Sequence, residues 1–459
     1  MNSLQISLKC SLLPFLNDIL DVIRAYQPYI EIIQDSENIF IIETQEDDFT
    51  YSYRISFKSY EDDFSFKKGG NTLNDKRNFK KIIKNSIYNI LKNELNFGLP
   101  YGSLTGVRPT IVGRKASNLN EISNYLIEEY DVSKYRAKLL QEIIFNQNKI
   151  YELEQKNICL YINIPFCPSR CSYCSFVSNE INKVKSLINP YVEVLEQQID
   201  EFLELYIKQN LILKSIYVGG GTPSCIELFL IEKIISKISG FNCEFTFEAG
   251  RPETITKELL TLLQKNNVNR ISINPQSFSI KTLSQVNRNS SIEKIYEAFK
   301  LAKQYEFCIN SDLIIGLDGE MENDILNSIQ ELAALNPENI TIHSLSIKKG
   351  SKMFEKGNKK PIYGLEDFLI NCYNYLKANS YVPYYLYRQK NTLDNLENIG
   401  FSKIGKECIY NILNMEDICS IYAVGAGAIS KLVDVNTNYI ERKSYPKDIK
   451  QFLKFFNKL

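Results

Sequence analysis

Three cysteines stand within eight residues of one another, at Cys167, Cys171 and Cys174. Thiolates are soft ligands that select iron–sulfur clusters or zinc. Zinc sites usually combine two C-x-x-C pairs, or cysteine with histidine, whereas this chain has one histidine, His343, and no second C-x-x-C. Three thiolates on a four-iron cluster leave one iron open to a small molecule. The spacing favours such a cluster over zinc or over three buried structural thiols.

The cysteines follow the first of six short apolar runs, which alternate with amphipathic stretches. The runs are 158–164, 215–218, 243–247, 270–273, 308–315 and 340–345. The helical stretches between them include 191–205, 226–238, 256–263, 292–305 and 323–334. This alternation predicts an α/β fold with a parallel sheet and right-handed crossovers. Six units fall short of the eight of a closed barrel, so we expect an incomplete (β/α)6 barrel with a wide mouth.

Polar residues follow nearly every run, at the point where a parallel strand ends. In such sheets ligands bind at the carboxyl ends of the strands. The polar residues at these ends are therefore the first candidates for a site. They are Gly219, Gly220, Gly221, Thr222, Glu248, Arg251, Gln276, Asp312 and His343.

The C-x-x-x-C-x-x-C spacing after the first strand of an incomplete barrel resembles the radical S-adenosylmethionine (SAM) superfamily. The segment 161–176 resembles its oxygen-independent coproporphyrinogen III oxidase branch, and the HemZ-type subgroup in particular. Other matching segments follow in the same order along the chain. They are 106–110, 219–224, 247–252, 270–277, 287–288, 312–317, 342–348 and 385–391.

The resemblance implies a cluster and a cofactor. Cys167, Cys171 and Cys174 would ligate a 4Fe-4S cluster whose open iron binds SAM, which electron transfer cleaves to methionine and a 5′-deoxyadenosyl radical. The backbone of segment 219–222, three glycines followed by Thr222, would approach the methionine moiety of SAM, because glycine has no Cβ to block contact. The implied cofactor-binding residues are Tyr161, Gly219, Gly220, Gly221, Thr222, Glu248, Gln276, Arg288 and Asp312, with a later glycine-rich turn at Gly425–Ala428.

The resemblance also implies a tetrapyrrole substrate, most simply coproporphyrinogen III converted to protoporphyrinogen IX in haem biosynthesis, and an electron donor such as flavodoxin or ferredoxin. Arg251, Lys348 and Arg388 are candidates for holding substrate carboxylates, with surface salt bridges as the alternative. His343 is the only imidazole for proton transfer or haem ligation, with a structural role as the alternative. Two other functions stay open: a haem-binding or haem-modifying relative without oxidase activity, and a structural zinc module.

Two departures from the family pattern bear on function. Ser175 stands where the bacterial oxidase of established type has a further cysteine, which puts the full decarboxylation in doubt. Haem chaperones of this branch carry a motif with histidine and tryptophan in their C-terminal part. This chain has no tryptophan, and 387–391 lacks the histidine. Haem transfer by that motif is therefore disfavoured.

Composition excludes several classes. The 459 residues hold 54 Lys plus Arg and 54 Asp plus Glu, so the formal net charge is zero. The composition therefore gives no positive excess that would favour binding to nucleic acid. No apolar run reaches the roughly 18 residues of a membrane span, and the first residues do not form a signal peptide. The 11 cysteines, an odd and scattered set, indicate a reducing compartment, so we expect a cytoplasmic protein.

The chain changes character near residue 157. Before it, 38–44 and 49–57 resemble strands, whereas 75–95 and 119–152 carry helical periodicity. We expect an α+β extension of unknown role at 1–150, the partial barrel with its cluster and SAM site at 151–350, and an α/β extension over the barrel mouth and substrate side at 351–459.

Overall fold

The computed structural model divides into two compact units, Met1–Gln141 and Glu142–Leu459. It describes residues 3–11, 16–27, 29–70, 72–151, 153–176, 178–288, 290–348, 350–355, 364–389, 392, 395–437 and 439–458. Glu152 and the last two residues of segment 385–391 lie outside the described residues. The units meet within helix α5, and the predicted division at residues 150 and 350 stays a prediction.

The first unit is a five-stranded sheet in the order β2-β1-β3-β4-β5. Strand β1 is parallel to β2 and β3, and the other pairs are antiparallel. Alternate residues of β4 are buried, and Tyr51 stacks on Phe79 of α2 at 5.1 Å between ring centroids. The elements are β1 Leu4–Cys10, α1 Leu16–Ala25, β2 Ile30–Ile32, β3 Ile39–Glu46, β4 Thr50–Phe57, β5 Tyr60–Lys67 and α2 Thr72–Leu95.

The region 119–152, predicted as one helical stretch, holds a 3-10 turn and two α-helices, and the short helix α3 precedes it. Helix α4 ends at Tyr130 because Asp131 adopts a left-handed φ of 55°, which terminates a helix. Helix α5 starts again at Lys134. The elements are α3 Pro109–Gly113, the 3-10 turn η1 Leu119–Glu121, α4 Ile122–Tyr130 and α5 Lys134–Gln147.

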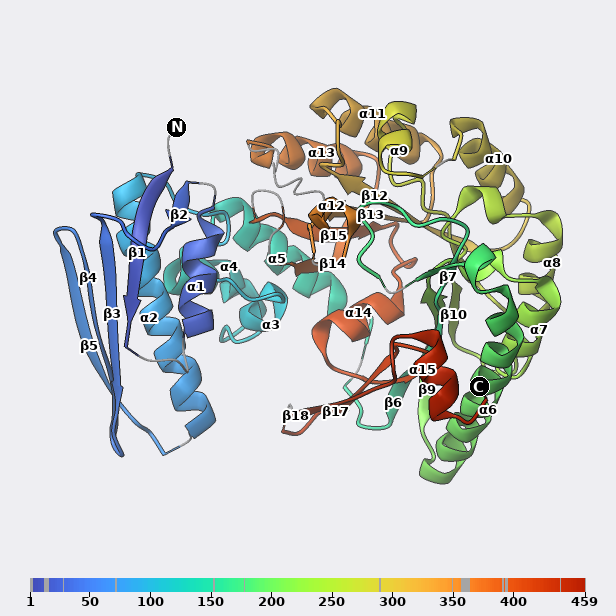
Figure 1. Cartoon of the computed structure of the whole chain (residues 1–459), viewed down its shortest axis with the longest axis horizontal. Helices are drawn as coiled ribbons and strands as arrows, with labels where there is room; N and C mark the ends of the chain where they lie inside the picture. The colour runs from blue at the N-terminus through green and yellow to red at the C-terminus, as the bar shows by residue number, and fades with distance from the viewer. Residues whose placement is uncertain are drawn as a thin grey trace. The chain divides into compact units, whose positions relative to one another are not determined.

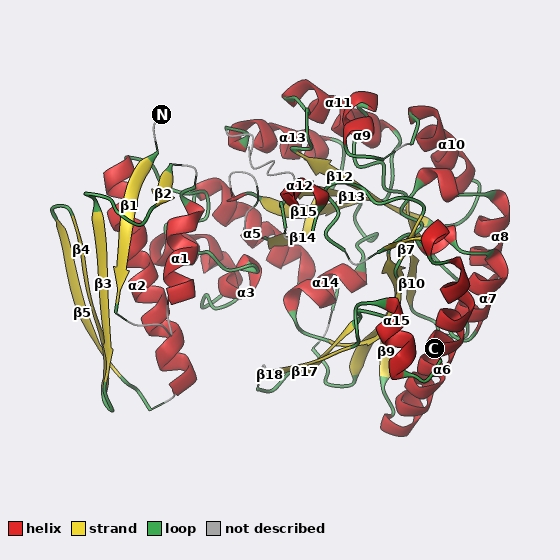
Figure 2. Cartoon of the chain, viewed as in Figure 1, coloured by secondary structure: helices red, strands yellow, loops and turns green. Residues whose placement is uncertain are grey.

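The second unit contains the predicted partial barrel. Six strands, β6, β9, β10, β11, β12 and β13, run parallel and neighbour one another in chain order. Figure 2 shows their connecting helices around the outside of the curved sheet. The strands are β6 Asn157–Ile164, β9 Ile212–Gly220, β10 Glu244–Phe247, β11 Arg270–Ser272, β12 Cys308–Ile315 and β13 Asn339–Ser344. The helices are α6 Lys185–Gln209, α7 Leu228–Ser236, α8 Lys257–Lys265, α9 Ile280–Gln285, α10 Ile292–Ala302 and α11 Glu322–Ala334. The expected fold class is confirmed.

Short elements line the loops of this barrel. They are β7 Phe166–Cys167, β8 Asn179–Glu180, and the 3-10 turns η2 Ile181–Lys183, η3 Pro223–Cys225 and η4 Pro252–Thr254. Each 3-10 turn or strand pair holds a loop close to a strand end.

The C-terminal part of the chain extends the same sheet at both ends. Strand β16 lies parallel to β6 and continues into antiparallel β17 and β18, while β15 pairs antiparallel with β13 and β14 pairs with β15. The sheet therefore has eleven strands. The elements are α12 Lys352–Glu355, α13 Glu366–Ala378, β14 Val382–Arg388, β15 Glu397–Ser402, α14 Ile409–Glu416, β16 Ser420–Val424, β17 Ile429–Asp434, β18 Tyr439–Ser444 and α15 Ile449–Phe455.

Helix α14 lies on the inner side of the curved sheet, opposite α7, α8 and α10 (Figure 1). The buried carboxylate of Glu244 accepts hydrogen bonds from the backbone N–H groups of Ile409 and Tyr410, both at 2.9 Å. Arg270 lies 3.2 Å from Glu244 and donates to the carbonyls of Lys406 and Glu407. Glu244 of β10 and Arg270 of β11 thus anchor the start of α14 and position its Tyr410.

No described helix combines the length and the apolar character that a membrane crossing requires. All 11 cysteines are described, and none of them forms a disulfide bond.

Candidate functional site

The cysteine loop begins where the first barrel strand ends. Cys167 belongs to β7, which pairs in parallel with β8 and brings Cys167 opposite Glu180. The loop is fastened to the segment after α9, because Ser172 N donates to Val286 O at 3.0 Å and Asn287 Nδ2 donates to Arg170 O at 2.9 Å. Cys174 N donates to Cys171 O at 3.2 Å. These bonds give the three cysteines a fixed backbone.

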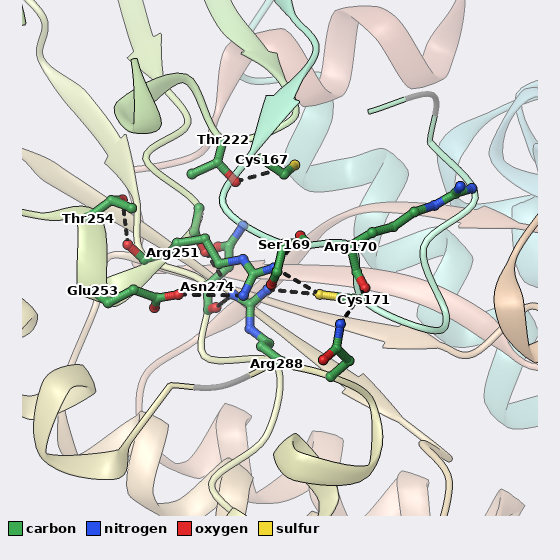
Figure 3. A network of polar contacts seen from close by, with 12 residues as sticks. Cys167, Ser169, Arg170, Cys171, Thr222, Arg251, Glu253, Thr254, Asn274 and Arg288 are labelled. Atoms are coloured by element: carbon green, nitrogen blue, oxygen red, sulfur yellow. Dashed lines mark hydrogen bonds and ion pairs between the residues drawn. The ribbon is translucent and has the colours of Figure 1, made fainter. Parts of the chain in front are cut away.

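Two buried arginines converge on Cys171 (Figure 3). Arg251 Nη2 lies 3.2 Å from Cys171 Sγ and donates to Ser169 O at 2.9 Å. Arg288 Nη1 lies 4.0 Å from the same sulfur, and its Nη2 donates to the carbonyls of Gly250 and Asn274. Two positively charged guanidinium groups therefore lie beside one of the three sulfurs.

Cys167 and Cys174 have different surroundings. Burial raises the pKa of Cys174 to about 11, and the neighbouring cysteines add to this rise. Burial also raises the pKa of Cys167, although Thr222 Oγ1, at 3.6 Å from its sulfur, lowers it. Thiols in such places lose their protons when a metal binds, because the metal replaces the missing positive charge.

The residues present fit an iron–sulfur cluster. Within the described parts of the chain, no three His, Cys, Asp or Glu side chains gather closely enough to hold a single metal ion. A four-iron cluster bonds each cysteine to a different iron, so its ligands surround a larger volume than those of one zinc ion. Three soft sulfurs on one loop, with two cations beside them, suit that larger group.

The glycines at the end of β9 allow the chain to pack closely on itself. A Cβ at Gly219 would lie 2.5 Å from Glu248 Oε2, and one at Gly221 would lie 2.4 Å from Phe166 O. Gly220 has a φ of +109°, and a Cβ there would lie 1.9 Å from Asn163 Oδ1. The missing side chains therefore make room for Glu248, Asn163 and the strand of Cys167. The predicted approach of this backbone to the methionine moiety of SAM stays a prediction.

Two carboxylates face each other across the carboxyl ends of β10 and β12. Burial, and then the charge of Asp312, raise the pKa of Glu248 to about 7. Hydrogen bonds from the Gly220 N–H and the Tyr217 hydroxyl oppose this rise, as does the charge of His343. His343 Nε2 lies 3.7 Å from Asp312 Oδ2. The predicted residues Glu248, Asp312 and His343 therefore form one group.

Gln276 contributes an acceptor that lacks a partner. Its backbone has a φ of 70° and bridges to Leu313 of β12, which fixes the position of the side chain. Its Oε1 is buried and has no hydrogen-bond partner in the structure. An orphaned buried acceptor is costly. A donor on a bound cofactor, such as the amino group or a ribose hydroxyl of SAM, would satisfy it.

Tyr161 lies in a stack of three tyrosines on the inner face of the sheet. Its ring centroid is 6.1 Å from Tyr217 and 6.2 Å from Tyr410, and the latter two are 4.6 Å apart. Its hydroxyl donates to Asn163 Oδ1 at 3.1 Å. Asn163 Nδ2 in turn donates to Ala426 O at 2.6 Å, so the predicted glycine-rich turn at Gly425–Ala428 lies beside Tyr161.

The remaining candidates lie further out. His343 Nδ1 lies 3.3 Å from Asn398 Oδ1 and 3.2 Å from Tyr387 Oη. Arg388 follows Tyr387 in β14, so strand alternation directs its side chain to the opposite face, where it donates to Asn395 O. Lys348 is exposed on the loop after β13. The described contacts link neither cation to the cysteine loop.

Several site residues were missed from the sequence. Tyr217, Tyr387 and Tyr410 are three of 29 tyrosines, and no spacing marks them. Asn163 and Asn398 act through partners more than 50 positions away. Only Asn163 had a local signal, since it lies two residues after Tyr161 in the same strand and therefore on the same face of the sheet.

Comparisons with known proteins found one matching family model and several similar proteins. The model of the Radical SAM superfamily matches residues 161–332. The oxygen-independent coproporphyrinogen-III oxidase-like protein HemZ of Bacillus subtilis is 35% identical over 402 residues, which cover 83% of this chain and 80% of that protein. The heme chaperone HemW of Escherichia coli is 27% identical over 60% of this chain and 70% of its own. The solved coproporphyrinogen III oxidase (HemN) of Escherichia coli superposes with a TM-score of 0.49 at 19% identity, over 68% of this chain and 72% of that one.

Proposed function

Because the chain belongs to the radical SAM superfamily, and within it to the family of HemZ-type coproporphyrinogen-III oxidase-like proteins, we propose that it is a radical SAM oxidoreductase acting on a tetrapyrrole. The superfamily uses a 4Fe-4S cluster and SAM. The proposed reaction is the oxygen-independent decarboxylation of coproporphyrinogen III to protoporphyrinogen IX in haem biosynthesis. The single observation that carries the substrate class is the 35% identity over 80% of the HemZ protein.

When bound, the cluster and SAM supply one-electron cleavage and hydrogen-atom abstraction. The residues of the chain hold and orient these groups. Cys167, Cys171 and Cys174 ligate the cluster, and Arg251 and Arg288 balance the charge of Cys171 and hold its loop. Glu248, Gln276 and Asp312 offer acceptors to the cofactor's amino group and hydroxyls.

The proposed reaction needs no proton transfer by a side chain. A hydrogen atom leaves the β-carbon of a propionate, the carboxylate leaves as carbon dioxide, and one electron passes to an acceptor as the vinyl double bond forms. We therefore assign His343 a positioning role, since its Nδ1 engages Asn398 and Tyr387 while its Nε2 faces Asp312. Lys348 is exposed and free to meet a propionate, whereas the placement of Arg388 does not favour that role.

A haem-binding protein without oxidase activity is the second candidate, because heme chaperones are 27–29% identical to this chain. The missing tryptophan and the missing histidine in 387–391 weigh against the chaperone motif. The odd and scattered set of 11 cysteines supports work in a reducing, anaerobic cytoplasm.

The test is anaerobic reconstitution with iron and sulfide, followed by dithionite, SAM and coproporphyrinogen III. We expect both 5′-deoxyadenosine and a vinyl product by mass spectrometry. Cys171→Ala should abolish both, whereas Cys308→Ala, at the opposite end of the sheet, should preserve them. Deoxyadenosine without vinyl product would exclude this substrate, and tight haem binding with neither product would favour the second candidate.

A further inference from the structure

The surface beside the cysteine loop gathers cations from separate segments. Strand β8 pairs with the strand of Cys167 and places Glu180 opposite it. Lys183 Nζ lies 3.0 Å from Glu180 Oε2. Lys185 follows two residues after Lys183, at the start of α6, and Arg170 belongs to the cysteine loop itself.

The loop after β13 is bound to the cysteine loop, which fixes the place of Lys352. Arg170 Nη2 donates to Gly350 O at 2.6 Å, and Met353 N donates to Ser172 O at 3.0 Å. Figure 3 shows Arg170 directed away from the buried pair Arg251 and Arg288. Two arginines from other segments therefore point inward at the sulfur of Cys171, whereas Arg170 of the loop itself points outward.

An exposed aromatic ring lies within this basic rim. Phe176, two residues after Cys174, has 71% of its surface exposed. Lys183, Lys185 and Lys352 are exposed as well. Glu355 is an exposed acid on the same short helix as Lys352, and Glu180 is held by Lys183, so the rim keeps a positive excess. The rim therefore offers a charge that is complementary to an acidic protein surface, with one large apolar side chain among the cations.

We propose that this rim, Arg170, Lys183, Lys185 and Lys352 around Phe176, docks an acidic one-electron carrier protein that reduces the cluster. The inference rests on the proposed function, because the site must hold a cluster that consumes an electron. One electron leaves the carrier, which is oxidised, and enters the cluster, which is reduced, and no bond or proton moves. With a net charge of zero, the chain as a whole does not attract an acidic partner, so local cations must orient it.

The experiment mixes the reconstituted, full-length protein with a reduced flavodoxin and follows bleaching of the cluster by stopped-flow absorbance. Calorimetry measures flavodoxin binding in parallel at low and high salt. For the double variant Lys183→Glu with Lys352→Glu, we expect the second-order rate constant of cluster reduction by flavodoxin to fall by at least about tenfold. Flavodoxin binding should weaken by a similar factor, because two attractive contacts become repulsive. Reduction by dithionite should be unchanged.

A matched control reverses two exposed lysines at the amino end of the sheet, Lys208→Glu with Lys214→Glu, and should leave both readouts as in the wild type. Wild-type rates that do not fall with ionic strength, or a rim variant that accepts electrons from flavodoxin as fast as the wild type, would overturn the proposal. If the rim variant assembles no cluster, Lys183→Gln with Lys352→Gln takes its place. A wild-type chain that assembles no cluster would refute the proposed function, while the salt dependence of flavodoxin binding would still decide for or against the rim.

Discussion

At the scale of single residues, Glu320 is a buried carboxylate that holds the turn after β12. It accepts hydrogen bonds from Gly316 N at 2.8 Å, Leu317 N at 3.2 Å and Ser277 Oγ at 3.2 Å. Burial nevertheless raises its pKa to about 7. The folded state therefore keeps a proton that the unfolded state releases, so stability from this group falls as pH rises from about 4.5 to about 7.

We predict that Glu320→Gln removes this part of the pH dependence. The wild-type free energy of unfolding should fall relative to the variant by up to roughly 3 kcal/mol across that window. Urea unfolding at several pH values measures the difference, and Glu248, which titrates in the same range, cancels in the comparison. Parallel curves for the two proteins would contradict the assignment.

Gly220 is the second residue whose replacement is informative. An added Cβ would meet Asn163 Oδ1 at 1.9 Å, and the φ of +109° is unfavourable for any other residue. We predict that Gly220→Ala lowers the free energy of unfolding by about 2 kcal/mol or more. Gly240→Ala, where a Cβ would meet no atom within 4 Å, should change it by less than about 0.5 kcal/mol in the same thermal or urea experiment.

The sequence predicted the chemistry of the site better than its contacts. The cysteines were predicted from their spacing, and Glu248, Asp312 and His343 from their places in or directly after the strands of a parallel sheet. Arg251 was expected to hold substrate, yet it donates to Ser169 O beside Cys171. Side-chain direction depends on tertiary packing, and the pattern of one strand does not encode which loop lies above it.

At the scale of elements, helix α14 depends on a buried ion pair. Glu244 and Arg270 each expose 6% of their side chains, and Glu244 also accepts the first N–H groups of α14. We predict that Glu244→Ala costs about 3–5 kcal/mol of unfolding free energy, because it leaves Arg270 buried without its counter-charge. Glu232→Ala breaks an exposed pair with Lys265 and should cost less than about 1 kcal/mol.

A near-ultraviolet circular dichroism spectrum of Glu244→Ala distinguishes the displacement of α14 from a general loss of stability. Tyr410 stacks on Tyr217 at 4.6 Å, so a displaced α14 should change the tyrosine signal before the protein unfolds. An unchanged spectrum with full stability in Glu244→Ala would refute the anchor. The sequence did not indicate α14, since its eight residues carry too short a pattern for periodicity to register.

At the scale of the whole molecule, helix α5 spans the limit between the two compact units. Gln147 near its end donates to Tyr384 O at 3.0 Å and Glu416 Oε1 at 3.1 Å, and Asn146 donates to Pro383 O at 2.9 Å. We predict that a chain of residues 132–459 folds and assembles a cluster. A chain of 151–459 should be less stable by about 2–4 kcal/mol, because it lacks these three bonds. Iron content and urea unfolding compare the two, and equal stability would refute the role of α5.

The sequence predicted the six barrel strands in order, but it did not predict the five further strands, β14 to β18, that extend the sheet at both ends. Strand β15 pairs with β13 and strand β16 pairs with β6, both far away in the chain, and local patterns carry no information about such pairing. In the first unit, β1 and β2 are short or broken by polar residues, so only β3 and β4 stood out.

The pairing of β16 with β6 also sets an order of events during synthesis. Cys159 of β6 and Cys419, next to β16, are 260 positions apart. At roughly 5–20 residues per second, a ribosome needs on the order of 10–50 s to synthesise the residues between them. Throughout that time one edge of β6 has no neighbour and is free to pair with another nascent chain. Messages that stall before β16 should therefore yield aggregates, and a chaperone that shields this edge would raise the yield of intact protein.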